Sequence, residues 1–259
     1  MVKTKIAIVA MMIVIFALIS ASIYAKNPDV KIYFGISYMD WTERDYSPTP
    51  STPFVEESGP IFSIGVDVTF RFKEFFEEFT TENFGGLLWY KSNYILTGQP
   101  CDIYVDRMGI DTEETTGYRM NIYKDFNFSP FVSFGFSPLW RDETEIWLFC
   151  YGKLGAILEK GDFFVKIGVL IPFFTEDDCF WAGIPWLNNG RLTRIVAYPK
   201  GVIMPFAEVG FRFKKFDFSF FYDPREWERS DNVNLKNGWY AYQPETEKNS
   251  IGFKVGYHF

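Results

Sequence analysis

Large apolar residues alternate with small or charged residues over long stretches of this chain, and the chain ends on such a stretch. From Ile251 to Phe259 every second residue is Ile, Phe, Val or Tyr, and glycine, lysine and histidine lie between them. The same period of two runs through "IFSIGVDVTFRF" and "VIMPFAEVGFRF". Successive side chains of a β-strand point to opposite faces, so this pattern predicts strands with one apolar and one polar face.

Ten strands are expected from this alternation. They lie at about 31–41, 61–72, 84–96, 117–124, 129–138, 145–159, 162–173, 202–213, 215–223 and 250–259. The stretches 84–96 and 117–124 alternate least regularly, so a fold of eight strands that lacks this pair is the alternative. Between the second and third strands, the segment "KEFFEEFTTEN" is expected to form a turn of helix.

The connections between these strands are alternately long and short. The expected long ones are 42–60, 97–116, 174–201 and 224–249, whereas the others are short or of medium length. The segment 139–144 is the exception, because it is short where a long loop is due. Long outer loops and short periplasmic turns are typical of outer-membrane barrels. The sequence therefore predicts an all-β fold, a closed antiparallel up-and-down transmembrane β-barrel.

The N-terminal segment is predicted to be a signal peptide. Lys3 and Lys5 precede an uncharged stretch from Ile6 to Ile19, and small residues follow up to Ala25. We therefore expect residues 1–25 to be removed on export and residues 26–259 to form the barrel domain. No apolar run of 18 residues follows, so any membrane crossing in the remaining chain must use strands.

The bulk of the apolar residues indicates that they face lipid and that the polar side faces the lumen. A barrel of eight to ten strands is only just wide enough for side chains, and inward phenylalanines would overfill it. The charges expected in the lumen, structural or pore-lining, are Asp67, Arg71, Lys91, Arg119, Lys153, Lys166, Glu208, Arg212, Asp217 and Lys254. The aromatic residues expected in girdles at the membrane interfaces are Tyr38, Trp41, Trp89, Trp140, Trp147, Phe173, Phe213, Tyr222 and Phe259.

The last strand resembles the C-terminal strand of bacterial outer-membrane β-barrel proteins. The resemblance is carried by Phe253, Val255, Tyr257 and the terminal Phe259. It implies that these residues form an assembly signal for the barrel-assembly machinery. It also implies that the exported protein resides in the outer membrane of a Gram-negative bacterium, in contact with lipid.

Few residues offer chemistry for catalysis or metal binding. The only histidine, His258, lies at the periplasmic end of the closing strand, so we expect no enzyme and no Ser/His or Asp/His site. The acidic run with Asp102, Asp111 and Glu113 does not match a calcium-binding loop and is expected to be a solvated loop. No metal site or cofactor is predicted, and the net charge of −7 argues against nucleic acid.

The three cysteines allow at most one disulfide in an exported chain. Cys101 and Cys179 fall in two of the expected outer loops, so we expect that a disulfide can join them. Cys150 lies on the lipid-facing side of its strand and should remain a thiol.

Three functions are compatible with this pattern. The first is a surface-binding or membrane-structuring barrel whose long loops contact an extracellular ligand and whose lumen is filled by side chains. The second is a narrow porin-like channel for small solutes or ions. The third is a soluble secreted lipocalin-like barrel that binds an apolar ligand, which would require the apolar faces to point inward.

Overall fold

A computed structural model describes residues 28–44, 53–93, 100–141, 145–181, 193–234 and 240–259. The predicted signal peptide, at 1–25, lies outside these residues. In the described part of the chain, no helix has the length and apolar character needed to span a membrane.

The structure is a closed antiparallel β-barrel, and the predicted fold class with ten strands is confirmed. The barrel strands are β1 (Asp29–Arg44), β2 (Pro53–Phe72), β3 (Phe75–Asn93), β4 (Pro100–Tyr118), β6 (Phe126–Arg141), β7 (Glu145–Lys160), β8 (Phe163–Trp181), β11 (Met204–Phe213), β12 (Phe216–Glu228) and β15 (Glu245–His258). The last strand pairs with both β12 and β1, from Lys31 opposite His258 to Arg44 opposite Glu245, and so closes the barrel.

Five short strands extend this frame. They are β5 (Met120–Tyr123), β9 (Thr193–Ala197), β10 (Lys200–Gly201), β13 (Val233–Asn234) and β14 (Tyr240–Ala241). In the barrel sheet, β5 follows β4 directly and pairs with β6. The strand β9 pairs with β8, and β10 pairs with β12. The strands β13 and β14 pair only with each other, within the connection between β12 and β15.

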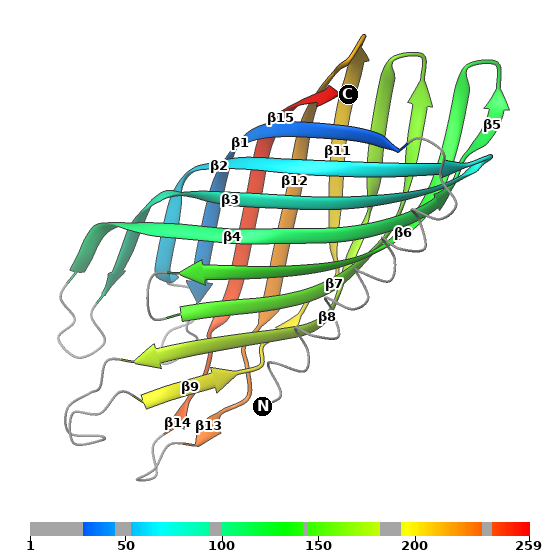
Figure 1. The fold of residues 1–259 in the computed structure, drawn as a ribbon. Helices are drawn as coiled ribbons and strands as arrows, with labels where there is room; N and C mark the ends of the chain where they lie inside the picture. The colour runs from blue at the N-terminus through cyan, green and yellow to red at the C-terminus, as the bar shows by residue number, and fades with distance from the viewer. Residues whose placement is uncertain (1–27, 45–52, 94–99, 142–144, 182–192, 235–239) are drawn as a thin grey trace.

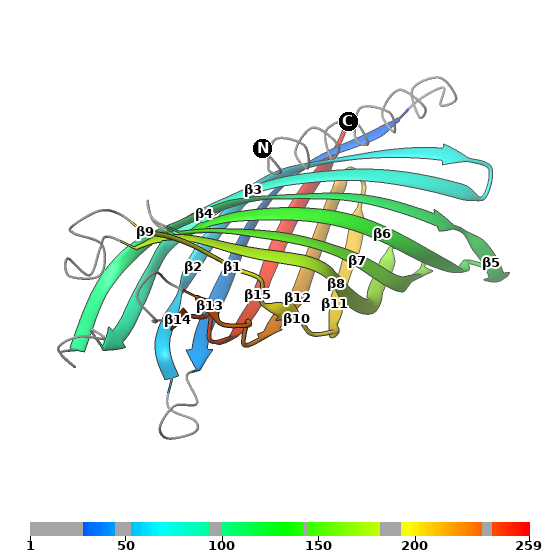
Figure 2. The ribbon, with the colours of Figure 1, turned by 90° about the horizontal axis from the view of Figure 1, so that it is seen from below.

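Four two-residue turns between described strands, at 73–74, 124–125, 161–162 and 214–215, lie at the same end of the barrel as the C-terminus (Figure 1). Each contains one residue with positive φ, and these residues are Lys73, Lys124, Gly161 and Lys214. A positive φ at a turn residue lets two antiparallel strands connect over two residues. The short strands β9, β13 and β14 lie toward the opposite end, as Figures 1 and 2 show. The turn end is periplasmic in barrels of this type, and the other end is extracellular.

The apolar faces of the strands point outward. Large apolar side chains are strongly exposed around the wall, as shown by Phe34 at 63%, Phe62 at 60% and Phe163 at 67%. Exposed apolar patches of this extent belong against lipid. The observed orientation is the opposite of the one that a lipocalin-like barrel requires.

The outer ends of several strands are polar on their outward side. On β1 the apolar series ends at Tyr38 and is followed by Asp40 and Thr42, and on β15 Glu247 and Asn249 precede Ile251. A tilted strand needs about 9–11 residues to cross the hydrocarbon region. Strands of 16 to 20 residues, such as β1 and β2, therefore project beyond it at the extracellular end.

The predicted bounds of the third and fourth strands were wrong, because both strands are longer than expected. The third strand begins at Phe75, directly after a short turn, so the expected turn of helix at 73–83 is part of β3. The expected loop 97–116 is mostly β4, and its acidic residues Asp111 and Glu113 line the lumen. The predicted solvated acidic loop does not exist there.

Candidate functional site

The lumen is filled by aromatic side chains near its extracellular end. Trp41 from β1, Trp147 from β7 and Trp227 from β12 are each only 1–2% exposed. The ring centroids of Trp41 and Trp147 lie 5.0 Å apart, and those of Trp147 and Trp227 lie 5.1 Å apart. The prediction that Trp41 and Trp147 lie in a membrane girdle was therefore wrong, because both face inward and pack on one another.

A buried ion-pair network lies beside these tryptophans. Both oxygens of Glu57 accept hydrogen bonds from Arg107, at 2.5 and 2.7 Å, and Arg141 donates to Glu57 at 2.5 Å. Arg141 also contacts Glu43 at 2.6 Å and Glu145 at 2.5 Å. Glu57 is fully buried, and the two arginine side chains are 2% and 4% exposed.

Together these residues form an outer seal, which we define as Trp41, Trp147, Trp227, Glu57, Arg107 and Arg141. The guanidinium of Arg141 lies 4.5 Å from the Trp41 ring centroid and so joins the aromatic cluster to the ion pairs. Two arginines near the turn end, Arg119 and Arg212, are 41% exposed, whereas their partner Glu159 is 10% exposed. The residues of the outer seal are therefore less accessible than these two arginines.

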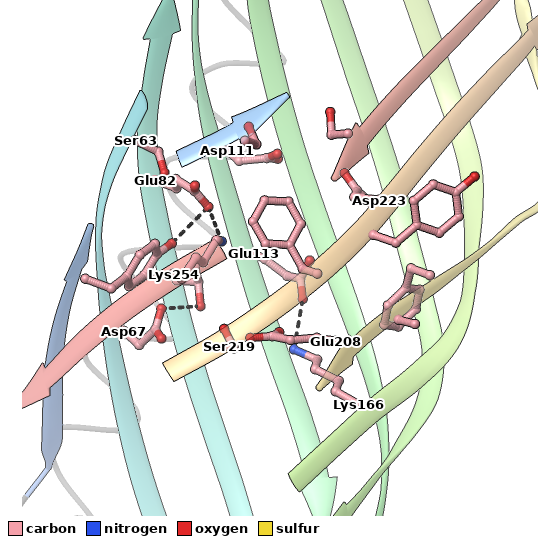
Figure 3. Close-up of a pocket in the computed structure, with 18 of the residues that line it drawn as sticks. Ser63, Asp67, Glu82, Asp111, Glu113, Lys166, Glu208, Ser219, Asp223 and Lys254 are labelled. Carbon is pink, nitrogen blue, oxygen red and sulfur yellow. Dashed lines mark hydrogen bonds and ion pairs between the residues drawn. The ribbon is translucent and has the colours of Figure 1, made fainter. Parts of the chain in front are cut away.

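Below the seal, the lumen holds a chamber of about 230 Å³ (Figure 3). Charges of both signs line it, and most are paired across the barrel. Lys254 on β15 donates to Glu82 on β3 at 2.6 Å, and the hydroxyl of Tyr33 donates to the same carboxylate at 3.0 Å. Lys31 contacts Asp67 at 2.7 Å.

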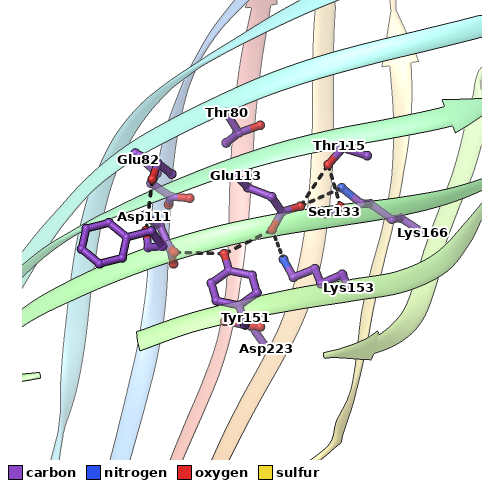
Figure 4. A network of polar contacts seen from close by, with 12 residues as sticks. Thr80, Glu82, Asp111, Glu113, Thr115, Ser133, Tyr151, Lys153, Lys166 and Asp223 are labelled. Carbon is purple, nitrogen blue, oxygen red and sulfur yellow. Dashed lines mark hydrogen bonds and ion pairs between the residues drawn. The ribbon is translucent and has the colours of Figure 1, made fainter. Parts of the chain in front are cut away.

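Glu113 on β4 is the centre of a second network in this chamber (Figure 4). Lys153 lies 2.6 Å from its carboxylate, and Lys166 lies 3.9 Å from it. The hydroxyl of Tyr151 donates to Glu113 at 3.2 Å and lies 3.0 Å from Asp111. These contacts hold β4, β7 and β8 together through the lumen, and they satisfy charges that would be costly to bury alone.

Lys248 is the one lysine of the chamber lining without an ion-pair or hydrogen-bond partner in the described part of the chain. It is 7% exposed, and its ammonium lies 5.5 Å from the ring centroid of Phe84. Its neighbour Arg225 is paired with Asp111 at 2.8 Å and with Asp223 at 3.2 Å. Lys248 is directly opposite Trp41 of the outer seal, and it is thus a chamber-lining lysine without a directly bonded carboxylate among the described residues.

Most of the predicted lumen charges are found where the sequence placed them. The residues that line the chamber are Asp67, Lys153, Lys166, Glu208, Arg212, Asp217 and Lys254. Arg119 contacts Glu159 at 3.1 Å near the turn end.

Two of the predicted lumen charges do not line the chamber. Lys91 was assigned to the wrong face, because it lies on the outward side of β3 and is exposed. Arg71 is exposed at the turn end of β2, outside the chamber.

The residues of the outer seal were not predicted as lumen residues. Glu57, Arg107 and Arg141 all fell in stretches that were read as connections. Continuing the alternation of β2 past Ile61 to Gly59 and Glu57 would have placed Glu57 on the inward face. The alternation therefore continues to Glu57, but it is hard to recognise in the sequence because the inward residues there are small or polar.

His258 lies at the periplasmic end, as expected. Its Nδ1 is 2.8 Å from Asp29, and its Nε2 is 3.0 Å from Asp217. The imidazole of His258, on β15, therefore contacts both β1 and β12. It lies at the opposite end of the barrel from the outer seal.

The predicted disulfide between Cys101 and Cys179 is not formed. Cys101 is a free, buried thiol on β4, and β6 and β7 separate it from β8, which carries Cys179. A disulfide needs Cα atoms within about 7 Å of each other, whereas three strand spacings amount to roughly 14 Å. Among the described residues, no group of His, Cys, Asp and Glu side chains is arranged to hold a metal ion.

The fold is similar to solved outer-membrane barrels at low sequence identity. The outer-membrane protease OmpT from Escherichia coli is 7% identical, with a TM-score of 0.47, over 91% of this chain and 98% of its own. The translocator domain of the autotransporter NalP from Neisseria meningitidis is 12% identical, with a TM-score of 0.37, over 99% and 98%. The attachment invasion locus protein Ail of Yersinia pestis is 8% identical, with a TM-score of 0.32, over 90% and 99%.

No protein-family model matches the sequence. No curated protein sequence matches it either.

Proposed function

We propose that this outer-membrane barrel does not conduct and that it acts at the cell surface through its extracellular strand extensions and loops. The observation that carries the proposal is the outer seal. Three tryptophans and a buried ion-pair network occupy the lumen at its extracellular end, and their side chains are almost inaccessible. A solute that entered the chamber from the periplasm would meet this seal.

The extensions of β3 and β4 support a role at the surface. Beyond the membrane-crossing part of these strands, Ile103 and Tyr104 are 49% and 64% exposed. Tyr104 packs edge-on against Trp89, with ring centroids 4.6 Å apart, so β3 and β4 share an aromatic contact at this end. Exposed aromatic residues on a rigid element are suited to contacts with another molecule.

Conductance of the purified protein in planar lipid bilayers tests the proposal. The wild type should show no steady openings, whereas a triple variant with Trp41→Ala, Trp147→Ala and Trp227→Ala should conduct, because it removes the aromatic half of the seal. Trp89→Ala, which changes an outward-facing tryptophan, is the matched control and should stay silent. Steady openings of the wild type would favour the narrow-channel alternative instead.

We also propose that the barrel is not an enzyme. The support is the position of His258, which is the only histidine of the chain and lies at the periplasmic end between two aspartates. The same purified protein should cleave neither peptide nor lipid-ester substrates, and measurable turnover of either would contradict this part of the proposal.

A further inference from the structure

The outward face of the barrel is apolar except over β3 and β4. Other strands of the barrel wall expose large side chains such as Phe34 on β1, Phe163 on β8 and Phe220 on β12. On β3 and β4 most outward positions at this level instead carry a polar patch, which consists of Glu77, Thr81, Asn83, Thr112, Glu114 and Thr116, with Phe79 and Ile110 as the apolar residues among them. Side chains next to these residues along each strand, such as Glu78 and Glu82, line the lumen, so the patch lies on the opposite face.

The polar patch lies within the lipid-facing belt rather than above it. Thr81 and Asn83 are directly opposite Val66 and Ile64 of β2. Glu114 and Thr116 are directly opposite Phe134 and Val132 of β6. Apolar side chains continue toward the turn end at Phe75 and Ile122, and toward the outer end at Leu87 and Met108. Apolar surface therefore surrounds the patch on every side.

Polar groups at this position need partners, because lipid supplies none. The carboxyl groups of Glu77 and Glu114 are close neighbours on this face, because Glu77 is directly opposite Thr116, which lies two residues along β4 from Glu114. Thr112 donates to the carbonyl of Phe136 at 3.2 Å. In the described part of the chain, the side chains of Thr81, Asn83 and Thr116 have no hydrogen-bond partner. Polar residues that face the membrane interior mark functional surfaces.

We propose that the polar patch is the contact surface between two copies of this barrel in the membrane. Hydroxyl and amide groups both donate and accept hydrogen bonds, so the same patch on a second copy, related by a two-fold axis, can satisfy them. Gly85 and the threonines are small and permit close approach, as at other contacts within membranes.

Site-specific photo-crosslinking in membranes tests the identity of the partner. A photoreactive amino acid at Asn83 should give a product with the mass of two chains. The same probe at Val209, which is 49% exposed on the distant strand β11, is the control and should not. A product with a different protein at position 83, or no protein product at all, would overturn the proposal, as would equal yields at both positions.

A second measurement tests how strongly the polar patch stabilises the dimer, and it does not depend on a crosslinking probe. The triple variant Thr81→Leu, Asn83→Leu and Thr116→Leu makes the patch apolar, which should preserve the fold, and it should weaken dimerisation by at least about tenfold in lipid nanodiscs or detergent. Val209→Leu is the matched control and should leave the dimer unchanged. A wild type that stays monomeric at micromolar concentration, or an equally stable dimer of the triple variant, would contradict the proposal.

Discussion

Glu57 is the residue on which the outer seal depends most. Its carboxylate is completely buried and is shared by Arg107 and Arg141. Arg141 retains Glu43 and Glu145 when Glu57 is removed, but no other acidic partner of Arg107 exists among the described residues. The loss of this one charge therefore leaves a buried guanidinium uncompensated.

We predict that Glu57→Gln lowers the free energy of unfolding by about 3–5 kcal/mol, the cost typical of breaking a buried ion pair. Glu228→Gln is the matched control, because Glu228 pairs with Lys200 at a strongly exposed site, where an ion pair contributes about 1 kcal/mol or less. Urea unfolding in micelles, followed by tryptophan fluorescence, measures both. Equal losses for the two variants would show that the network does not stabilise the seal.

At this scale the sequence predicted the charges of the lumen better than its aromatic residues. Asp67 and Lys254 stand in strict alternation with phenylalanine and valine, so their face could be read directly. Trp41 and Trp147 also stand in phase with inward residues, but tryptophan near a strand end is equally typical of a membrane girdle. Only the packing of three strands from different parts of the barrel decides between these positions.

At the scale of the element, the position of a residue along its strand determines how deep it lies in the membrane, and this depth sets how much a charge there destabilises the barrel. Ile36 and Thr42 lie on the same outward face of β1, but Ile36 is within the apolar belt and Thr42 is beyond it. We predict that Ile36→Arg destabilises the barrel by about 2–4 kcal/mol and Thr42→Arg by about 1 kcal/mol or less. Unfolding in lipid vesicles checks this, and similar costs at the two positions would contradict the assigned membrane boundary.

The strands β3 and β4 show why the sequence left part of the fold unpredicted. Recognition of a lipid-facing strand depends on an apolar outward face, and here that face carries glutamate, threonine and asparagine, while Phe76, Phe84 and Leu88 face inward. The sequence therefore predicts a strand only at 84–96, with a turn of helix at 73–83 before it and a loop at 97–116 after it. The same residues that obscured these strands form the proposed contact between two barrels.

At the scale of the whole molecule, the sequence was sufficient for the architecture because length, turn spacing and alternation agree on one closed sheet. The orientation in the membrane follows from the four short turns at one end.

We predict that Tyr104→Cys, in a chain whose own cysteines are replaced by serine, reacts with a membrane-impermeant maleimide on intact cells. Lys73→Cys, in the turn between β2 and β3, should react only after the outer membrane is permeabilised. Labelling in the reverse order would contradict the orientation.

The two ends of the described chain meet at the closing seam, where the amide of Phe259 donates to the carbonyl of Val30 at 3.0 Å. A short linker between these ends, with new termini opened in the connection at 45–52, would give a circular permutant with every strand pair intact. Such a chain would keep its fold in detergent while its terminal phenylalanine became internal. Refolding and delivery to the membrane could then be measured as two separate properties of one amino-acid composition.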